Sequence, residues 1–178
     1  MRDIDHDIVR TALIEDLPRL WRYALSISRN HHVAEDLVQA TCVRALERRD
    51  QFQPGTNVVA WLFTILSSIW KNQLRADKVR AGAGFVDPEE VLVVDGAREI
   101  ETNNLLRRVL REVESLPEAQ RQTVLLVYVE QFTYREAAHI LDVPIGTIMS
   151  RLSAARLALA GLAREPGRLD TRLDKERP

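Results

Sequence analysis

Residues 132–162 read FTYREAAHILDVPIGTIMSRLSAARLALAGL, and this stretch decides the fold of the second half of the chain. Thr133, followed three residues later by Glu136, forms a capping box, in which each side chain accepts a hydrogen bond from the other residue's backbone amide. A short helix is therefore predicted to begin there. Asp142 and Pro144 predict a turn and a second helix, because proline has no amide hydrogen to leave unpaired in a first helical turn.

The second helix of this pair has one apolar and one polar face. The positions at helical spacing that we expect to be buried are Ile148, Leu152, Ala155 and Leu159. Two short helices with small polar and basic residues near the start of the second favour a helix-turn-helix, whose second helix enters the major groove of DNA. An ordinary pair of helices without a nucleic-acid role remains the alternative. The residues left for a partner are Thr147, Met149, Ser150, Arg151, Ser153 and Ala154.

Three further helices are expected in the first half of the chain. The second covers about residues 33–49 after a cap at Asn30, and the third covers about residues 57–78 after a break at Pro54-Gly55. The first two helices each carry a stripe of apolar residues at helical spacing. These stripes comprise Leu13, Leu17, Leu20, Ala24 and Ile27, and then Leu37, Val38, Cys42, Ala45 and Leu46.

Charge is distributed unevenly along the 178 residues. The formal net charge is -1, yet residues 81–101 carry one basic and six acidic side chains, while each flanking segment has a net charge of +2. The middle segment is also rich in glycine and alanine at its start, which favours a solvated connector. A long surface loop within one domain is the alternative, although such loops are uncommon in compact domains.

These patterns predict an all-α protein with two small helical domains joined by a flexible acidic linker. The first domain spans residues 1–80, the linker 81–101, and the second domain, which contains the helix-turn-helix, 102–164. The tail, residues 165–178, alternates in charge and is expected to be disordered.

Composition excludes several classes of protein. A single cysteine, Cys42, cannot form an internal disulfide or supply a cysteine metal cluster, which indicates a reducing cytoplasm. The most apolar stretch is too short to cross a bilayer, and the N-terminus lacks the order of a signal peptide. Adjacent His31 and His32 point about 100° apart on a helix and form no metal site. We expect a cytoplasmic protein with no membrane insertion, no catalytic residues, no metal and no cofactor.

The third helix combines aromatic and basic side chains. Trp61, Phe63 and Trp70 are followed by a basic end that contains Lys71 and Arg75. Aromatic faces stack with unpaired bases, and basic side chains follow the phosphate backbone, so the combination suits single-stranded DNA. The alternative for Trp61 is a place in a hydrophobic core. Binding of DNA requires that the tryptophan-bearing surface is not sealed inside the protein.

Together these segments resemble the extracytoplasmic-function (ECF) sigma factors, the small promoter-specificity subunits of bacterial RNA polymerase. The resemblance covers roughly residues 17–162 in the order of the family. Residues 34–46, AEDLVQATCVRAL, are similar to its polymerase-binding helix, and residues 61–65, WLFTI, to the start of its helix for the -10 promoter element. Residues 116–121, LPEAQR, and 146–152, GTIMSRL, are similar to its -35-binding domain.

The resemblance implies a role for individual residues. Asp36, Gln39 and Arg44 would face the clamp helices of core RNA polymerase, with Leu37 and Val38 divided between that contact and the core. Residues from Phe52 to Asn57, with Ser68, would border a pocket for a flipped base, and Trp61 would frame it. The implied -10 DNA-binding residues are Phe52, Asn57, Trp61, Ser68, Lys71 and Arg75. The implied -35 DNA-binding residues are Thr147, Met149, Ser150, Arg151, Ser153 and Arg156.

The sequence also departs from the family. Ser68 stands where an asparagine is frequent, and Met149 and Ala154 stand where basic residues are common. Fewer basic contacts weaken the attraction to phosphates and flatten the salt dependence of binding. Two alternatives follow: a sigma-like decoy that binds only an anti-sigma factor, and a helix-turn-helix repressor. The resemblance implies promoter DNA, core polymerase and an anti-sigma factor as partners of a chain that is monomeric when free, and implies no enzymatic activity.

Overall fold

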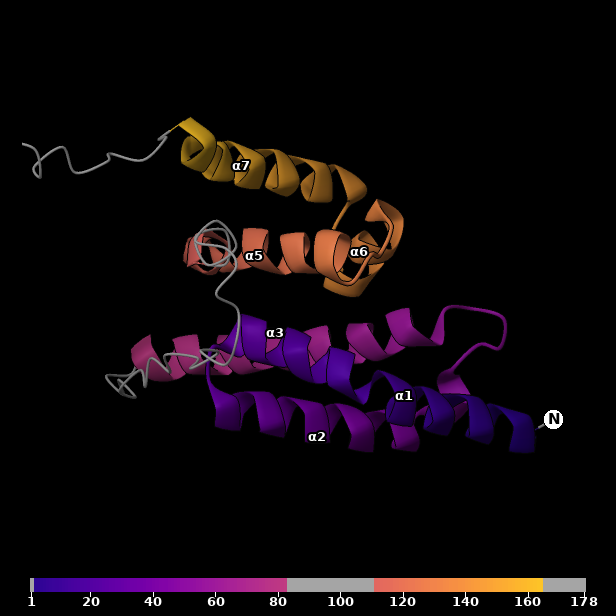
Figure 1. Ribbon diagram of the computed structural model, residues 1–178. Coiled ribbons are helices and arrows are strands. Elements are labelled where there is room, and N and C mark those ends of the chain that lie inside the picture. The colour runs from indigo at the N-terminus through magenta and orange to yellow at the C-terminus, as the bar shows by residue number, and fades with distance from the viewer. Residues whose placement is uncertain (1, 83–110, 165–178) are drawn as a thin grey trace, which may run out of the picture.

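The computed structural model describes residues 2–82 and 111–164, and every regular element in these two ranges is a helix (Figure 1). This confirms the all-α prediction. The N-terminal module, residues 2–82, consists of α1 (Arg2–Ser28), α2 (His31–Glu47), the short 3-10 helix η1 (Arg49–Gln51) and α3 (Val58–Gly82). The C-terminal module, residues 111–164, contains α5 (Glu118–Val124), the π-helical turn η2 (Leu125–Val129), α6 (Tyr134–Leu141) and α7 (Ile145–Arg164).

The starts of the helices follow the signals in the sequence. The Asn30 side chain accepts a hydrogen bond of 3.1 Å from the amide of Val33 and thereby caps α2, as expected. Asn57 caps α3 in the same way, through a 3.1 Å bond from the amide of Ala60. These bonds satisfy backbone donors that have no partner within the helix.

In the N-terminal module, α1 packs against α2 and α3. Leu20 and Ile27 are buried as predicted, but Leu17 is 42% exposed. The reason is its angular position: Leu17 lies at the edge of the buried face, beside Ile14, which precedes it by three residues and is also exposed. Leu46, which belongs to the predicted apolar stripe of α2, is likewise 40% exposed.

In the C-terminal module, α7 packs against α5 and α6. Three of its four predicted core residues, Ile148, Leu152 and Ala155, are buried, and Leu159 is half-buried. The small buried residues Ala137 and Ala138 on α6 accompany this packing.

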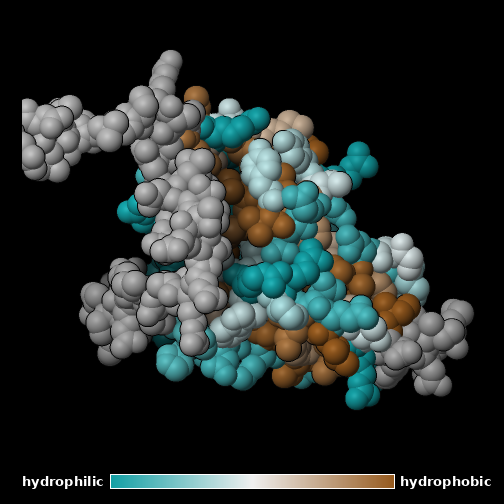
Figure 2. Space-filling view, viewed as in Figure 1, coloured by the Kyte–Doolittle hydropathy of each residue, from teal (hydrophilic) through white to brown (hydrophobic). Residues whose placement is uncertain are grey.

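The two modules pack directly on one another. In Figure 1 the C-terminal helices lie over the side of the N-terminal module formed by α3, and α3 contacts α6. The buried side chains of both modules form one hydrophobic cluster, in which the Phe63 and Phe132 rings meet edge to face at 5.0 Å. Figure 2 shows that, on the face drawn, hydrophilic side chains lie between the apolar patches.

The direct packing of the two modules was not predicted, because the sequence indicates only the composition of the segment that joins them. The predicted linker lies outside the described residues apart from its first two residues, which belong to α3, and the predicted tail lies outside them entirely. Among the described residues, no helix combines the length and the apolar composition of a membrane span.

Candidate nucleic-acid interface

The helix-turn-helix forms as predicted. Thr133 accepts a hydrogen bond from the amide of Glu136 (3.2 Å), whose carboxylate accepts one from the amide of Thr133 (2.8 Å). Asp142 ends α6 in the left-handed conformation at φ 52°, and the amide of Val143 donates to the carbonyl of Ala138 (3.0 Å). The turn therefore fixes the direction in which α7 leaves α6.

The capping box also affects the charge of Glu136. The hydrogen bond from the Thr133 backbone lowers the pKa of the Glu136 carboxyl below its usual value. Partial burial opposes this shift, and hydrogen bonds from the side chains of Asn57 and Thr133 reinforce it. Glu136 is consequently a stable carboxylate at the start of α6.

Most of the predicted -35 residues are accessible on α7. Met149, Ser150, Ser153 and Arg156 are exposed, and Thr147 is half-buried. The hydrogen bonds of the Ser150 hydroxyl and the Arg156 guanidinium end on carbonyls of α7 itself. This surface is thus available to a partner such as the major groove.

Arg151 is placed differently from the other residues of this set. It is half-buried and lines a cavity of about 510 Å³ between the modules. The cavity is lined from one side by Ser67, Ser68 and Lys71 of α3. In this arrangement, Arg151 therefore lies beside the N-terminal module.

The predicted -10 residues lie on and just before α3, but they do not all reach the surface. The Phe52 ring is buried and packs against the Trp61 ring with centroids 5.6 Å apart, so it supports Trp61 rather than lining an open pocket. Trp61 is half-buried and hence is not sealed inside, whereas Ser68 and Arg75 are exposed. Trp70, which the aromatic pattern also indicated, is buried to 8% exposure.

The polar groups of this helix contact carboxylates of the C-terminal module. The Lys71 ammonium lies 3.1 Å from the Asp142 carboxylate, and the Trp70 indole N–H donates to Glu118 at 2.6 Å. The side-chain amide of Asn57 donates to Glu136 at 2.7 Å. Sequence reasoning missed these three acidic residues, because their partners lie between 48 and 79 positions away in the chain.

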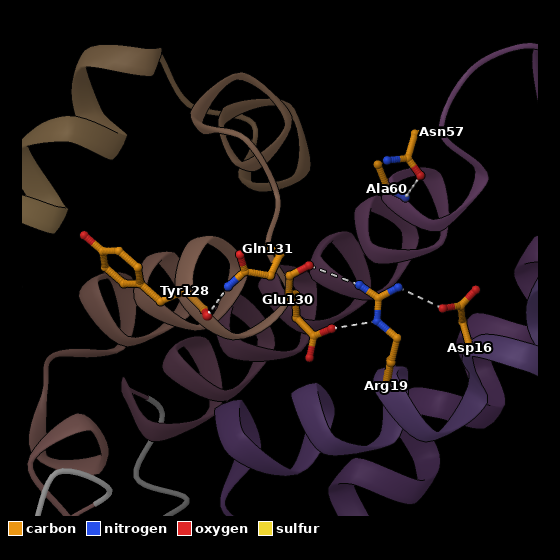
Figure 3. A network of polar contacts seen from close by, with 7 residues as sticks. All are labelled: Asp16, Arg19, Asn57, Ala60, Tyr128, Glu130 and Gln131. Atoms are coloured by element: carbon orange, nitrogen blue, oxygen red, sulfur yellow. Dashed lines mark hydrogen bonds and ion pairs between the residues drawn. The ribbon is translucent and has the colours of Figure 1, made fainter.

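A second group of contacts lies beside α1. Arg19 donates to the Glu130 carboxylate (2.9 Å) and carbonyl (3.1 Å), and to Asp16 (2.9 Å), as Figure 3 shows. Its guanidinium also lies over the rings of Phe63 and Phe132, at 5.8 and 5.9 Å from their centroids. Burial alone lowers the pKa of Arg19, but the bonds to Glu130 and Asp16 outweigh it, so that the pKa is raised.

Arg121 adds a contact from α5 to α1. Its buried guanidinium donates to the carbonyls of Leu116 (3.2 Å) and of Ile27 (3.1 Å), the latter near the C-terminal end of α1. Burial lowers the pKa of Arg121, as does the nearby charge of Arg29. The negative end of the α1 dipole favours a cation at this position.

The predicted polymerase-binding residues lie on α2. Asp36 and Gln39 are exposed and Arg44 is half-buried. Leu37 is only 1% exposed and Val38 is also buried, so both pack in the module's core, which was one of the two places expected for them, and neither presents its side chain to a partner in this arrangement. Sequence reasoning missed two exposed apolar neighbours, which are Val43 and the already mentioned Leu46.

The histidine pair has an ordinary environment. The His31 ring packs edge-on against Trp21 at 4.8 Å and its centroid lies 6.3 Å from that of His32. Within residues 2–82 and 111–164, no group of three or more histidine, cysteine, aspartate or glutamate side chains is placed to hold a metal ion.

Comparisons with known proteins identify both modules. Residues 13–80 match the family Sigma-70 region 2, and residues 106–159 match Sigma-70, region 4. The chain is 35% identical over 156 residues to the ECF RNA polymerase sigma factor EcfG of Rhodopseudomonas palustris (strain TIE-1), a match that covers 88% of this chain and 85% of the relative.

Solved structures have a similar fold. The sigma factor RpoE of Bartonella quintana, solved in complex with the anti-sigma factor NepR, has a TM-score of 0.72 and 32% identity, covering 90% of this chain and 99% of that one. The complex of the anti-anti-sigma factor PhyR with NepR from Bartonella quintana contains a similar fold. There the TM-score is 0.54 and the identity 16%, over 86% of this chain and 49% of that one. The fold alone therefore does not separate a sigma factor from an anti-anti-sigma factor, whereas the sequence similarity does.

Proposed function

The chain belongs to the ECF sigma factors of bacterial RNA polymerase, and from its geometry we propose that α7 and α3 divide the two promoter elements between them. As a member of this family it is a non-enzymatic transcription initiation factor that binds RNA polymerase and DNA. The observation that supports the division of labour is the pair of distinct surfaces: a polar, exposed helix-turn-helix and an aromatic, basic α3.

The -35 element binds α7 in this proposal. Exposed Ser150, Ser153 and Arg156 supply hydroxyl and guanidinium donors, which contact phosphates and base edges in protein–DNA complexes. Met149 contributes an apolar contact where a charge is common in the family. Thr147 and Arg151 complete the surface, the latter after it leaves the cavity between the modules.

The -10 element binds α3 and the loop before it. Trp61, held in place by the buried Phe52 ring, frames a site for an unpaired base, bordered by Asn57 and Ser68. Lys71 and Arg75 follow the backbone of the strand. Flipping a base costs a few kcal/mol, which contacts of this kind offset, so that binding traps the open promoter.

Core polymerase binds α2 through Asp36, Gln39 and Arg44. Leu37 and Val38 anchor this helix to its module. The proposed domain bounds are 1–80 for the module that binds polymerase and the -10 element, and 102–164 for the module that binds the -35 element, with the linker between them. A chain with these partners acts in the cytoplasm and is monomeric when free.

An anti-sigma factor is also proposed as a partner. The similar sigma factor RpoE was solved with its anti-sigma factor NepR, at 32% identity to this chain. A protein of that kind would cover polymerase-facing and DNA-facing surfaces of both modules.

In vitro transcription with purified core polymerase tests the proposal. We expect promoter-dependent transcripts only when this chain is added. Polymerase binding without transcripts would favour the decoy, and binding to duplex DNA as a dimer without polymerase would favour the repressor.

A further inference from the structure

Three side chains on or next to the proposed -10 surface donate hydrogen bonds to acidic residues of the C-terminal module. The donor–acceptor distances are 2.6–3.1 Å. The acceptor carboxylates lie at the start of α5, in the first turn of α6 and in the turn before α7. The pairs are Trp70 with Glu118, Asn57 with Glu136, and Lys71 with Asp142.

Carboxylates and DNA phosphates are both anionic hydrogen-bond acceptors, and an amide, indole or ammonium donor that binds one can bind the other. Resting on the function proposed above, we propose that in the free protein the C-terminal module covers the part of the -10 surface formed by Asn57, Lys71 and the neighbouring Trp70, with its carboxylates in place of DNA phosphates. Single-stranded DNA then binds α3 only after the two modules separate.

Two of these contacts are suited to competition rather than to holding the modules together. Lys71 and Asp142 have side chains that are 43% and 89% exposed, and exposed ion pairs contribute little to stability. The Glu136 carboxylate is already held by the capping box of α6, so α6 stays capped after Asn57 is released. Both contacts can therefore be exchanged for DNA at small cost.

A separate clamp holds the closed arrangement. Arg19 reaches the Glu130 side chain, which is 4% exposed, and the guanidinium lies over the junction between Phe63 and Phe132. Arg121 reaches across to the end of α1. None of these residues belongs to the proposed DNA-binding set, so the clamp can be altered without touching the surface that it keeps covered.

A cleft that is partly open to solvent also lies between the two modules. About 510 Å³ of solvent-accessible space lies between α3 and the helices α5, α6 and α7. The cavity is bordered by polar groups that include Ser67, Lys71 and His139. Lys71 and Asp142 both line this cleft, so their ion pair is open to solvent, in agreement with the exposure of the two side chains.

The first test opens the clamp with Arg19→Ala in the full chain. Removing one partner of a buried ion pair leaves Glu130 unpaired and favours separation. We expect a larger radius of gyration by small-angle X-ray scattering and tighter binding of a short fluorescein-labelled single-stranded oligonucleotide of mixed sequence, at fixed salt. If about 90% of the free chain is closed, the gain is roughly ten-fold.

Arg22→Ala is the matched control, because Arg22 is exposed on the same helix and carries the same charge. Both substitutions remove a positive charge, which by itself weakens the attraction to DNA. Tighter binding by the Arg19 variant alone is thus opposite in sign to a simple charge effect. Circular dichroism shows whether each variant is folded.

The second test removes the competing charges with the double variant Glu118→Gln and Asp142→Asn. Asparagine tolerates the left-handed conformation of position 142, so the turn is kept. Its control is Glu112→Gln with Glu15→Gln, which removes the same charge at two exposed or partly exposed positions outside these contacts and outside the clamp. We expect several-fold tighter oligonucleotide binding for the first pair than for the second.

The proposal is overturned if neither the Arg19 variant nor the Glu118/Asp142 variant exceeds its control in oligonucleotide affinity. Transcription by wild-type chain with core polymerase is measured alongside. If transcripts form but the variants and their controls bind the oligonucleotide equally well, the closed form is rejected and the sigma function is supported. Tighter binding by the variants without transcripts would support the closed form and remove the promoter role.

Discussion

The two helices proposed to contact DNA, α3 and α7, differ in what covers them. The polar side of α7 is open, with Ser150, Ser153 and Arg156 exposed. On α3, Ser68 and Arg75 are exposed, but Trp70 and Lys71 contact carboxylates of the C-terminal module. The polar surface of α7 is accessible, whereas Lys71 of α3 and Asn57 just before it are paired with carboxylates.

This difference corresponds to the kind of DNA that each helix is proposed to bind. Duplex DNA is always present in the cell, and a helix-turn-helix reads it without separating the strands. Unpaired DNA at the -10 element arises only during opening. In the proposed closed form, a partly covered α3 would avoid single-stranded nucleic acid elsewhere until the two modules separate.

The largest effect is expected from Phe132→Ala, which breaks the junction that covers α3. Truncating a buried phenylalanine costs about 3–5 kcal/mol. Because the Phe132 ring contacts Phe63 across the modules, we expect the two modules to lose their common unfolding transition in urea. The neutral comparison is Leu157→Ala, whose side chain is 75% exposed. A single transition with unchanged midpoint for Phe132→Ala would contradict the packing.

Next in size is Trp61→Ala, which tests the strand-binding role of α3. Loss of base stacking costs about 1–3 kcal/mol per base. We expect promoter opening, measured by permanganate reactivity of unpaired thymines, to fall more than formation of the closed promoter complex. An unfolded variant in a thermal melt would instead assign Trp61 to the core, where it supports Phe52.

On α7, Arg156→Ala should weaken -35 binding by about 1 kcal/mol, the net contribution of one ordinary hydrogen bond. Gel-shift assays with the polymerase complex and a fluorescent -35 duplex measure this loss.

Arg151→Ala should also reduce initiation while leaving polymerase binding intact. In vitro transcription measures initiation, and pull-down with core polymerase measures polymerase binding. Equal loss of DNA and polymerase binding for Arg151→Ala would make Arg151 structural, which its place beside α3 allows.

The smallest effect is a pH dependence at Glu136. Its pKa is lowered in the folded chain from the ordinary 4.5, so its contribution to stability is complete above that value. It is lost as the pH falls through the lowered pKa. The free energy of unfolding in urea should decrease more steeply in this acidic range for wild type than for Glu136→Gln. Parallel curves would show that the hydrogen bonds from Thr133 and Asn57 do not favour the carboxylate.

Local features were predictable because their causes are local. The capping box of Thr133 and Glu136 and the cap at Asn30 depend on residues three positions apart, and both were predicted. The exposure of Leu17 and the burial of Phe52 were not, because they depend on which neighbouring helix covers each side chain. The π-helical turn η2 could not be predicted from the apolar pattern of its residues either.

The sequence by itself determined the helices, the turn that separates α6 from α7, and the family. These follow from hydrogen-bond partners and apolar spacing within a few residues. Only the tertiary structure decided that the acidic side chains Glu118, Glu136 and Asp142 lie against α3, and that Arg19 binds Glu130. The physical reason is that contacts between distant segments depend on the complementarity of two assembled surfaces, which no stretch of the chain contains alone.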